Sequence, residues 1–460
     1  MRTSLTLTAV ATVLIAVLAI RQTNFGLFLV QDQNIFVNSE IVSDPIEFDT
    51  PIGGGRHLIV CIDGTWNSPG SLIDANSMGG IKQTAVLTPS NVVKLAFLLG
   101  GTTNQYNSNF NSTGMETQKV YYHSGVGTEV KNEDKAQLEA VFGNIEEHLL
   151  DAYTWLANEY QPGDEISAIG FSRGATIVRS LFSFIRYSGL ANVTSLLPIN
   201  RTACIQEALD LYKDRDLDIP TSAVPANVAA WKKKHAHPHV SLHFLGVMDT
   251  VMALDVPEGY SSIVPSSVIT ATLEATGAIE YNDYHDLRIG TEVRQAYHAL
   301  AIDEKRAYFP PTLFERAEGL RNDQVREQRW FRGSHADVGG GWWEAGLSHV
   351  VLDWMIEKAR EAGLKLKARE EFEKFYTPLL LGISREDFLA RNAIVKHDYF
   401  EYIGSKDGNS PLGRKIIRTL KDFYMDTEKF APSLLHDSVF HLLKDEPVPE
   451  NLIPFLSSSH

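Results

Sequence analysis

The sequence places one serine in a setting that is typical of a catalytic nucleophile. Ser172 is the centre of a Gly-x-Ser-x-Gly pattern formed with Gly170 and Gly174. An apolar run precedes this pattern and a long helical pattern follows it, as in a nucleophile elbow, where a tight strand-to-helix turn exposes the hydroxyl. Glycines are needed on both sides because side chains would clash in so tight a turn. The expected chemistry is attack by the hydroxyl on an acyl carbon; the plainer interpretation is a turn with an incidental serine.

A serine hydroxyl needs a general base, and the base needs a group that orients it. Asp249 follows the apolar run 240–248, so its carboxylate is expected at the same edge of a parallel sheet as Ser172. His335 lies in the glycine-rich stretch 333–341, whose glycines would let the imidazole reach back over the sheet. The order serine, aspartate, histidine is the one in which an α/β-hydrolase fold supplies its triad. We therefore predict a triad of Ser172, His335 and Asp249.

Plainer interpretations of the acid and the base stay open at this point. Asp249 could be a turn residue or a helix N-cap, and Asp255 competes as the acid, although it lies past the strand end in an insertion. A loop histidine such as His335 is, by itself, more often a surface residue than a catalytic one. The chain order of the three residues favours the triad.

The loop after the first strong strand is expected to help stabilise negative charge. Asp63, Gly64 and Thr65 follow the apolar run 57–62. A backbone N–H of Gly64 or Thr65, together with that of Arg173, is predicted to form an oxyanion hole. Asp63 itself is expected to anchor the loop through hydrogen bonds.

Several other kinds of site are not expected. Four histidines lie close together in the sequence, at His235, His237, His239 and His243. Some of them are four residues apart, but Pro238 interrupts the stretch and His243 lies in the predicted strand 240–248, so no pair is expected on one helical face, as a metal site of this spacing requires. The glycines of 339–341 are not followed by the Lys-Ser/Thr of a phosphate loop. The net charge of −15 argues against nucleic acid as a partner, because binding phosphates requires a basic face. We predict neither a metal nor a cofactor.

Short apolar runs alternate with helical patterns along the chain. The predicted strands are 57–62, 119–123, 165–170, 240–248 and 328–333. The predicted helices are 91–99, 135–159, 173–187 and 201–213. Several strands are nearly continuous runs of large apolar residues, as expected for strands buried on both faces. The alternation predicts an α/β fold of the α/β-hydrolase type, with a mainly parallel central sheet and helices on both faces.

The remaining stretches fit around this core. Residues 214–238 and 251–290 lack a sheet pattern and are predicted to be helical insertions that could cover a site. The pattern turns helical again beyond Trp342. We therefore expect a hydrolase domain over 56–455, with a core at about 56–345 and a helical C-terminal part at about 346–455.

The first 22 residues are expected to be an export signal. Arg2 precedes an uncharged run from Leu5 to Ile20. This run is long for a signal-peptide core and slightly short for a spanning helix, which needs about 17–25 residues. We expect residues 5–20 to remain as a single-pass membrane anchor, with the catalytic domain outside the cytoplasm and a polar tether at 23–55. Cleavage after Ala19, which would give a secreted or periplasmic protein, is the alternative.

Motifs spread over most of the chain resemble those of a known family. They are Asp63-Gly64-Thr65-Trp66-Asn67, Gly125-Val126-Gly127-Thr128, Pro162-Gly163-Asp164-Glu165-Ile166, Gly170-Phe171-Ser172-Arg173-Gly174-Ala175, Leu245-Gly246-Val247-Met248-Asp249-Thr250-Val251, His298 with Asp303-Glu304-Lys305-Arg306, His335-Ala336-Asp337-Val338-Gly339-Gly340-Gly341, His436-Asp437-Ser438-Val439 and Pro449-Glu450-Asn451-Leu452. On these residues the chain resembles the α/β-hydrolase family, long labelled a domain of unknown function, that includes the first class of type VI secretion phospholipase effectors.

The resemblance implies esterase or lipase chemistry with the triad on Ser172, Asp249 and His335. Met248 departs from the family pattern, which commonly has tryptophan before the aspartate, and this implies a different pocket wall. We expect a serine ester hydrolase that acts on phospholipids or other lipid esters. An esterase for soluble or glycan-borne esters is the second hypothesis. A non-enzymatic scaffold that retains the fold is the third, and the intact triad disfavours it.

Overall fold

The computed structural model of the protein describes residues 41–45, 55–65, 67, 72–73, 86–87, 89–101, 109–111, 117–126, 145–216, 223–252, 285–306, 309–314, 324–368, 371, 396, 435–436 and 439. The helices in these ranges are α2 (Asn91–Leu98), α4 (Ile145–Glu159), α5 (Arg173–Ser188), α6 (Pro198–Lys213), α7 (Ala226–His235), α9 (His335–Gly339) and α10 (Gly346–Glu361). The strands are β1 (Ile41–Ser43), β2 (His57–Ile62), β3 (Leu72–Ile73), β4 (Val86–Leu87), β5 (Asn109–Asn111), β6 (Gln118–His123), β7 (Glu165–Phe171), β8 (Ala223–Pro225), β9 (Ser241–Met248), β10 (Val293–Ala301) and β11 (Val325–Phe331).

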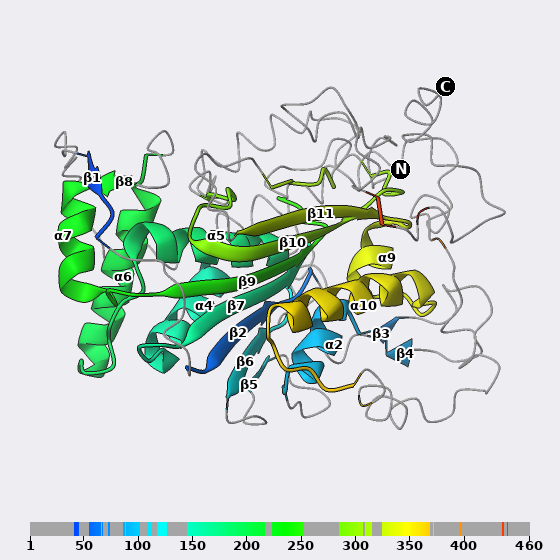
Figure 1. The fold of residues 1–460 in the computed structure, drawn as a ribbon, viewed down its shortest axis with the longest axis horizontal. Coiled ribbons are helices and arrows are strands. Elements are labelled where there is room, and N and C mark those ends of the chain that lie inside the picture. The colour runs from blue at the N-terminus through cyan, green and yellow to red at the C-terminus, as the bar shows by residue number, and fades with distance from the viewer. Residues whose placement is uncertain are drawn as a thin grey trace, which may run out of the picture.

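A seven-stranded sheet forms the centre of this fold (Figure 1). Its strand order is β11-β10-β9-β7-β2-β6-β5, and neighbouring strands are parallel except for the antiparallel pair of β5 and β6. Helices α4 and α5 contribute to the apolar core on one face, and α2 and α10 to the core on the other. The predicted α/β architecture with a mainly parallel sheet covered on both faces is therefore confirmed.

Strand β2 shows why the central strands are apolar along their whole length. Leu58, Val60 and Ile62 belong to the core that contains α4 and α5, whereas Ile59 and Cys61 belong to the core that contains α2 and α10. Successive side chains of a strand point to opposite faces. Since both faces of the sheet are covered, every one of these positions must be apolar.

The structure differs from the predicted elements at several places. Strand β10, between β9 and β11, was not predicted, and β11 begins and ends earlier than the predicted strand 328–333. The first predicted insertion, 214–238, contains the short strand β8 and helix α7. Residues 253–284 of the second insertion lie outside the described residues. Helix α10 lies in the predicted helical C-terminal part, most of which is also outside them.

Part of the predicted tether is attached to the domain. Strand β1 pairs in antiparallel fashion with β8. Next to it, Lys232 Nζ on α7 donates a hydrogen bond to Asp44 Oδ2 at 2.5 Å. The predicted anchor at residues 5–20 lies outside the described residues, and among the helices that the structure describes none is long and apolar enough to span a membrane.

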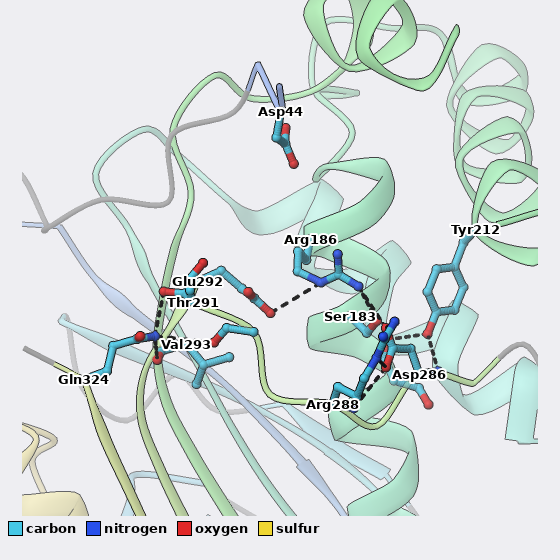
Figure 2. A network of polar contacts seen from close by, with 12 residues as sticks. Asp44, Ser183, Arg186, Tyr212, Asp286, Arg288, Thr291, Glu292, Val293 and Gln324 are labelled. Atoms are coloured by element: carbon cyan, nitrogen blue, oxygen red, sulfur yellow. Dashed lines mark hydrogen bonds and ion pairs between the residues drawn. The ribbon is translucent and has the colours of Figure 1, made fainter. Parts of the chain in front are cut away.

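A buried network of charges lies at the C-terminal end of α5 (Figure 2). Arg186, in the last turn of α5, pairs with Asp286 Oδ2 at 2.9 Å and with Glu292 Oε1 at 3.6 Å. Its backbone carbonyl accepts a hydrogen bond from Lys232 Nζ at 2.7 Å. These contacts fix the end of α5 opposite to the predicted nucleophile.

Candidate functional site

Three neighbouring parallel strands end at the same edge of the sheet, each followed directly by a predicted site residue. Asp63 follows β2, Ser172 follows β7 and Asp249 follows β9, with β7 between the other two strands. The backbone N–H of Ser172 donates to the carbonyl of Met248, the last residue of β9, at 3.0 Å. The carboxyl edge of a parallel sheet is where sites of such folds form.

Ser172 lies in a strained turn between β7 and α5. Its backbone has φ 56° and ψ −123°, a conformation that is uncommon for a residue with a side chain. The turn brings backbones very close together, since a Cβ on Gly174 would lie 2.2 Å from the Ile62 carbonyl oxygen and one on Gly170 would lie 2.6 Å from the Gly174 carbonyl oxygen. Both glycines of the pattern are therefore required sterically, as predicted for a nucleophile elbow.

The carboxylate of Asp249 contacts His335. Asp249 Oδ2 lies 2.6 Å from His335 Nδ1, and Asp249 Oδ1 accepts the backbone N–H of Ala301 on β10 at 3.0 Å. Asp249 is fully buried and has φ 39°. Because two different elements hold its two oxygens, the carboxylate has a fixed orientation toward the imidazole.

His335 does not lie in a loop, as the glycine-rich stretch suggested, but is the first residue of the short helix α9. Ser334 is the N-cap, and Asp337 Oδ2 accepts hydrogen bonds from both the N–H and the hydroxyl of Ser334, which completes a capping box. The backbone N–H of His335 donates to Glu304 Oε2 at 3.1 Å. The cap and the glutamate together fix the position of His335.

Aromatic rings also hold the imidazole next to the elbow. The ring centroid of His335 lies 4.6 Å from that of Phe171, the residue before Ser172, and 5.0 Å from that of Phe309. Burial lowers the pKa of His335 below its ordinary value, while the hydrogen bond and the charge of Asp249 act in the opposite direction. The imidazole is therefore neutral near pH 7, which is the form that can accept a proton.

The loop after β2 is held by Asp63. Asp63 Oδ1 accepts the N–H of Gly64 at 2.8 Å, and Oδ2 accepts the hydroxyls of Ser90 and Tyr122 at 2.7 and 2.8 Å. Burial raises the pKa of Asp63 to about 6, although these hydrogen bonds act against the shift. Asp63 thus anchors the loop, as expected. The N–H of Gly64 already makes this contact, whereas the oxyanion hole predicted from the sequence also names the N–H groups of Thr65 and Arg173.

Two other predicted donors remain available. Within the described residues, the backbone N–H groups of Thr65 and Arg173 make no hydrogen bond. Arg173 is the first residue of α5, where an N–H has no partner inside the helix. The side chains of the two residues are joined, since Arg173 Nε donates to Thr65 Oγ1 at 2.6 Å. The loop and the helix start are therefore linked beside Ser172.

The clustered histidines lie elsewhere. His235 ends α7, His237 packs its ring against Tyr160, and His243 Nε2 lies 2.5 Å from the Ala362 carbonyl oxygen, all near the amino end of β9. Among the described residues no group of three or more His, Cys, Asp or Glu side chains could hold a metal ion. Asp255, the competing acid, is outside the described residues.

The sequence model of the type VI secretion phospholipase effector Tle1-like catalytic domain matches residues 56–358. The chain belongs to this family. The Tle1-like region covers more than half of the chain and contains Ser172, Asp249 and His335. Helix α10 is also inside it, except for its last three residues.

Individual relatives of this Tle1-like chain are distant. An uncharacterized protein of Saccharomyces cerevisiae is 26% identical over an alignment of 473 positions, which covers 77% of this chain and 64% of that protein. An uncharacterized protein from Pseudomonas aeruginosa has a crystal structure with 17% identity and a TM-score of 0.34, covering 74% of this chain and 49% of the other. The structure of the Tle1 effector bound to the VgrG spike of the type 6 secretion system has 15% sequence identity and a TM-score of 0.31. The match covers 69% of this chain and 56% of the other. The chain thus spans less than two thirds of each of these proteins.

Sequence reasoning did not identify the residues that support His335. Glu304 and Arg306 belong to one of the motifs that resemble the family, but the sequence pattern assigns them no role. Glu304 is 2% exposed, and its carboxylate receives the Arg306 guanidinium at 2.8 and 2.9 Å in addition to the His335 N–H. The Arg306 guanidinium in turn lies 3.6 Å over the Phe309 ring that contacts His335. Nothing in the sequence indicates which of the many carboxylates would lie under the histidine.

Proposed function

We propose that this protein is a serine hydrolase that cleaves lipid esters. Ser172 Oγ attacks the acyl carbon, and His335 Nε2 takes the hydroxyl proton and later delivers it to the leaving alcohol. Asp249 holds the imidazole through Nδ1 and stabilises the imidazolium. The N–H groups of Arg173 and Thr65 bind the oxyanion, and water then hydrolyses the acyl-enzyme. The reaction needs no cofactor.

The observation that carries this proposal is the 2.6 Å contact between His335 Nδ1 and the fully buried Asp249, beside a serine with φ 56°. A binding scaffold would have no need of a strained serine, a neutral imidazole and a buried carboxylate in one place. In the described residues the Ser172 hydroxyl makes no hydrogen bond. Nucleophile–base hydrogen bonds are often long before substrate binds and shorten in the complex.

Membership of a phospholipase family supports a lipid ester over a soluble or glycan-borne one. The test is labelling with a fluorophosphonate, which reacts with activated serines, followed by a panel of phospholipids, neutral glycerides and soluble acetyl esters. We expect Ser172 to be labelled and the lipid esters to be hydrolysed fastest, with Ser172→Ala inactive in both assays. Labelling at another serine, or equal labelling of Ser172→Ala, would contradict the proposal.

We also propose that residues 5–20 hold the chain at a membrane with the catalytic domain outside the cytoplasm. The support is the charge asymmetry around the uncharged run, with Arg2 and the amino terminus before it. A membrane location would bring the site close to lipid substrates. Protease added to intact cells or spheroplasts should then digest the domain. A domain that is protected from the protease would show that the proposed orientation is wrong.

A further inference from the structure

The residue after the predicted nucleophile is a buried arginine with an unusual set of partners. Arg173 is 3% exposed, and its side chain makes one hydrogen bond within the described residues, from Nε to Thr65 Oγ1 at 2.6 Å. No carboxylate of the described chain forms an ion pair with it. By contrast, the buried guanidiniums of Arg186, Arg306 and Arg332 each pair with an aspartate or glutamate.

Burying a guanidinium without an anion is unfavourable because most of its hydration is lost, and at Arg173 a single hydrogen bond from Nε replaces it. The effect is visible in the acid–base behaviour of Arg173, since burial lowers its pKa to about 10. A fold that needed only packing at this position could use an apolar residue. A cation kept here, one residue from Ser172, is placed to pair with an anion that enters with the substrate.

The surroundings of Arg173 lie on one defined side of the nucleophile. In the sheet order β9-β7-β2-β6, Asp249 and His335 lie at the β9 side of Ser172, whereas Thr65 follows β2 on the other side. His123 ends β6, and its ring centroid lies 4.1 Å from that of His148 on α4. The β2 side of the nucleophile is thus free of the triad.

His148 adds a second polar group that lacks a partner on this side. Its Nδ1 is buried without a hydrogen bond. Burial lowers the pKa of His148 to about 3, and the charges of His123 and Arg173 act in the same direction, so the imidazole is neutral and can donate from one nitrogen. The acidic neighbour is Asp151, an exposed residue that lies 3.9 Å from His123 Nε2 and forms no ion pair with Arg173. The N-terminus of α5 also favours negative charge at this point.

We propose that Arg173, assisted by His148, binds the phosphodiester of a glycerophospholipid while Ser172 attacks an acyl ester of the same molecule. The inference rests on the proposed hydrolase function and assigns the side chains that would bind the phosphate of such a substrate. In a glycerophospholipid only the glycerol carbons and ester oxygens separate the phosphate from the acyl carbonyls. An anion site directly beside the nucleophile therefore matches a phospholipid and has no use for a neutral glyceride.

The test compares two substrates with identical acyl chains, phosphatidylglycerol and diacylglycerol, in the same neutral detergent micelles. Arg173→Gln should lower kcat/KM for phosphatidylglycerol about 10- to 100-fold more than kcat/KM for diacylglycerol, because a charge-assisted hydrogen-bond pair to phosphate is lost. Arg173→Lys should recover part of the preference. Lys233→Gln removes one positive charge from the exposed face of α7 and serves as the charge-matched control, with the preference unchanged.

A second measurement needs no variant and so does not depend on whether Arg173→Gln folds. In the wild-type protein, glycerol 3-phosphate should slow fluorophosphonate labelling of Ser172, whereas glycerol at the same concentration and ionic strength should not. An unchanged substrate preference in a folded Arg173→Gln protein, or equal effects of the two compounds, would overturn the phosphate assignment while leaving the hydrolase intact. Equal protection by acetate would assign the site to carboxylates and also overturn it. If the wild-type protein is not labelled at Ser172, the hydrolase proposal fails and this inference fails with it.

Discussion

The backbone N–H of His335 donates to Glu304 Oε2 at 3.1 Å, and the same carboxylate holds the Arg306 guanidinium. The carboxylate therefore acts on the position of the imidazole through its main chain, while Asp249 acts on the ring. Two buried acids thus fix one histidine from two directions.

Glu304→Gln should lower both stability and turnover. The substitution keeps the shape but removes the buried negative charge that pairs with Arg306, and breaking a buried pair costs about 3–5 kcal/mol. Thermal unfolding and kcat on a lipid ester measure the two effects. Glu357→Gln, at an exposed position on α10, is the matched control and should change neither. A Glu304→Gln protein with unchanged kcat would show that His335 does not need this support.

Ser172→Ala and His335→Ala should be strongly non-additive, because both residues act in one proton transfer. Each single change should reduce kcat by a factor on the order of 10⁶, and the double variant should lose little more than either one. If instead the double variant loses the product of the two factors, His335 acts independently of Ser172.

The pH dependence should report the buried imidazole. His335 must be neutral to accept a proton, and its pKa is lowered from 6.5, so activity should persist below pH 6.5 and fall as the pH drops through the lowered pKa. Asp249→Asn removes two influences that raise this pKa. The acid limb of kcat/KM should then move to still lower pH while the rate falls about 10⁴-fold. If the acid limb of the Asp249→Asn variant lies at the same pH as that of the wild type, Asp249 is not the acid of the triad.

Gly174→Ala should inactivate the protein through geometry alone. The added Cβ would lie 2.2 Å from one backbone oxygen and 2.4 Å from another, so the elbow must shift, at a cost of about 1–3 kcal/mol or more. Gly363→Ala is a useful comparison because it has φ +88° and no atom within 4 Å of the new Cβ. It should cost roughly 1–2 kcal/mol of conformational strain without affecting kcat. Urea unfolding measures the loss of stability in both variants, and kcat shows whether the elbow is disturbed. Together they distinguish the steric clash at Gly174 from the conformational strain at Gly363.

Two truncations should behave differently. Removing residues 1–22 should leave an active enzyme that is released from the membrane, because β1 and Asp44 are retained. Removing residues 1–45 should destabilise the domain, since β8 loses its partner strand and the buried Lys232 loses the carboxylate at 2.5 Å. Sedimentation of the activity and thermal unfolding of both proteins test this expectation. Equal stability of the two would mean that the β1 contact contributes nothing.

The elements that carry the predicted nucleophile and acid could be read from the sequence because their apolar runs are nearly uninterrupted. Strand β2 matches the predicted 57–62, and β7 and β9 differ from prediction by one residue. Strand β10 could not be read in this way, because Arg294, Gln295 and His298 interrupt it. Tertiary partners explain why His298 is accepted there: its Nε2 receives the Thr250 N–H at 3.1 Å, in the fully buried environment beside Asp249.

The sequence does contain a pattern that predicts the short helix at His335, although the neighbouring glycines favour a loop. Ser334 followed three residues later by an acid, Asp337, is a capping-box pattern and marks a helix start. The role of Gly64 could not be predicted, since the choice between a free N–H and one that Asp63 accepts depends on a rotation of the loop. Sequence order determines which residues meet at the sheet edge, but not which donors remain open there.

Helix α5 is fixed by contacts at both of its ends. Its 16 residues extend about 24 Å, with Ser172 before one end and the Arg186 network around the other. A backbone conformation with φ 56° at a serine costs about 1–3 kcal/mol. It is therefore maintained only where the contacts of the surrounding structure exclude other conformations. The reactive geometry is therefore a property of the whole helix rather than of the turn alone. Inactivating substitutions should accumulate around Arg186 and Asp286, at the far end of α5, as well as at the elbow.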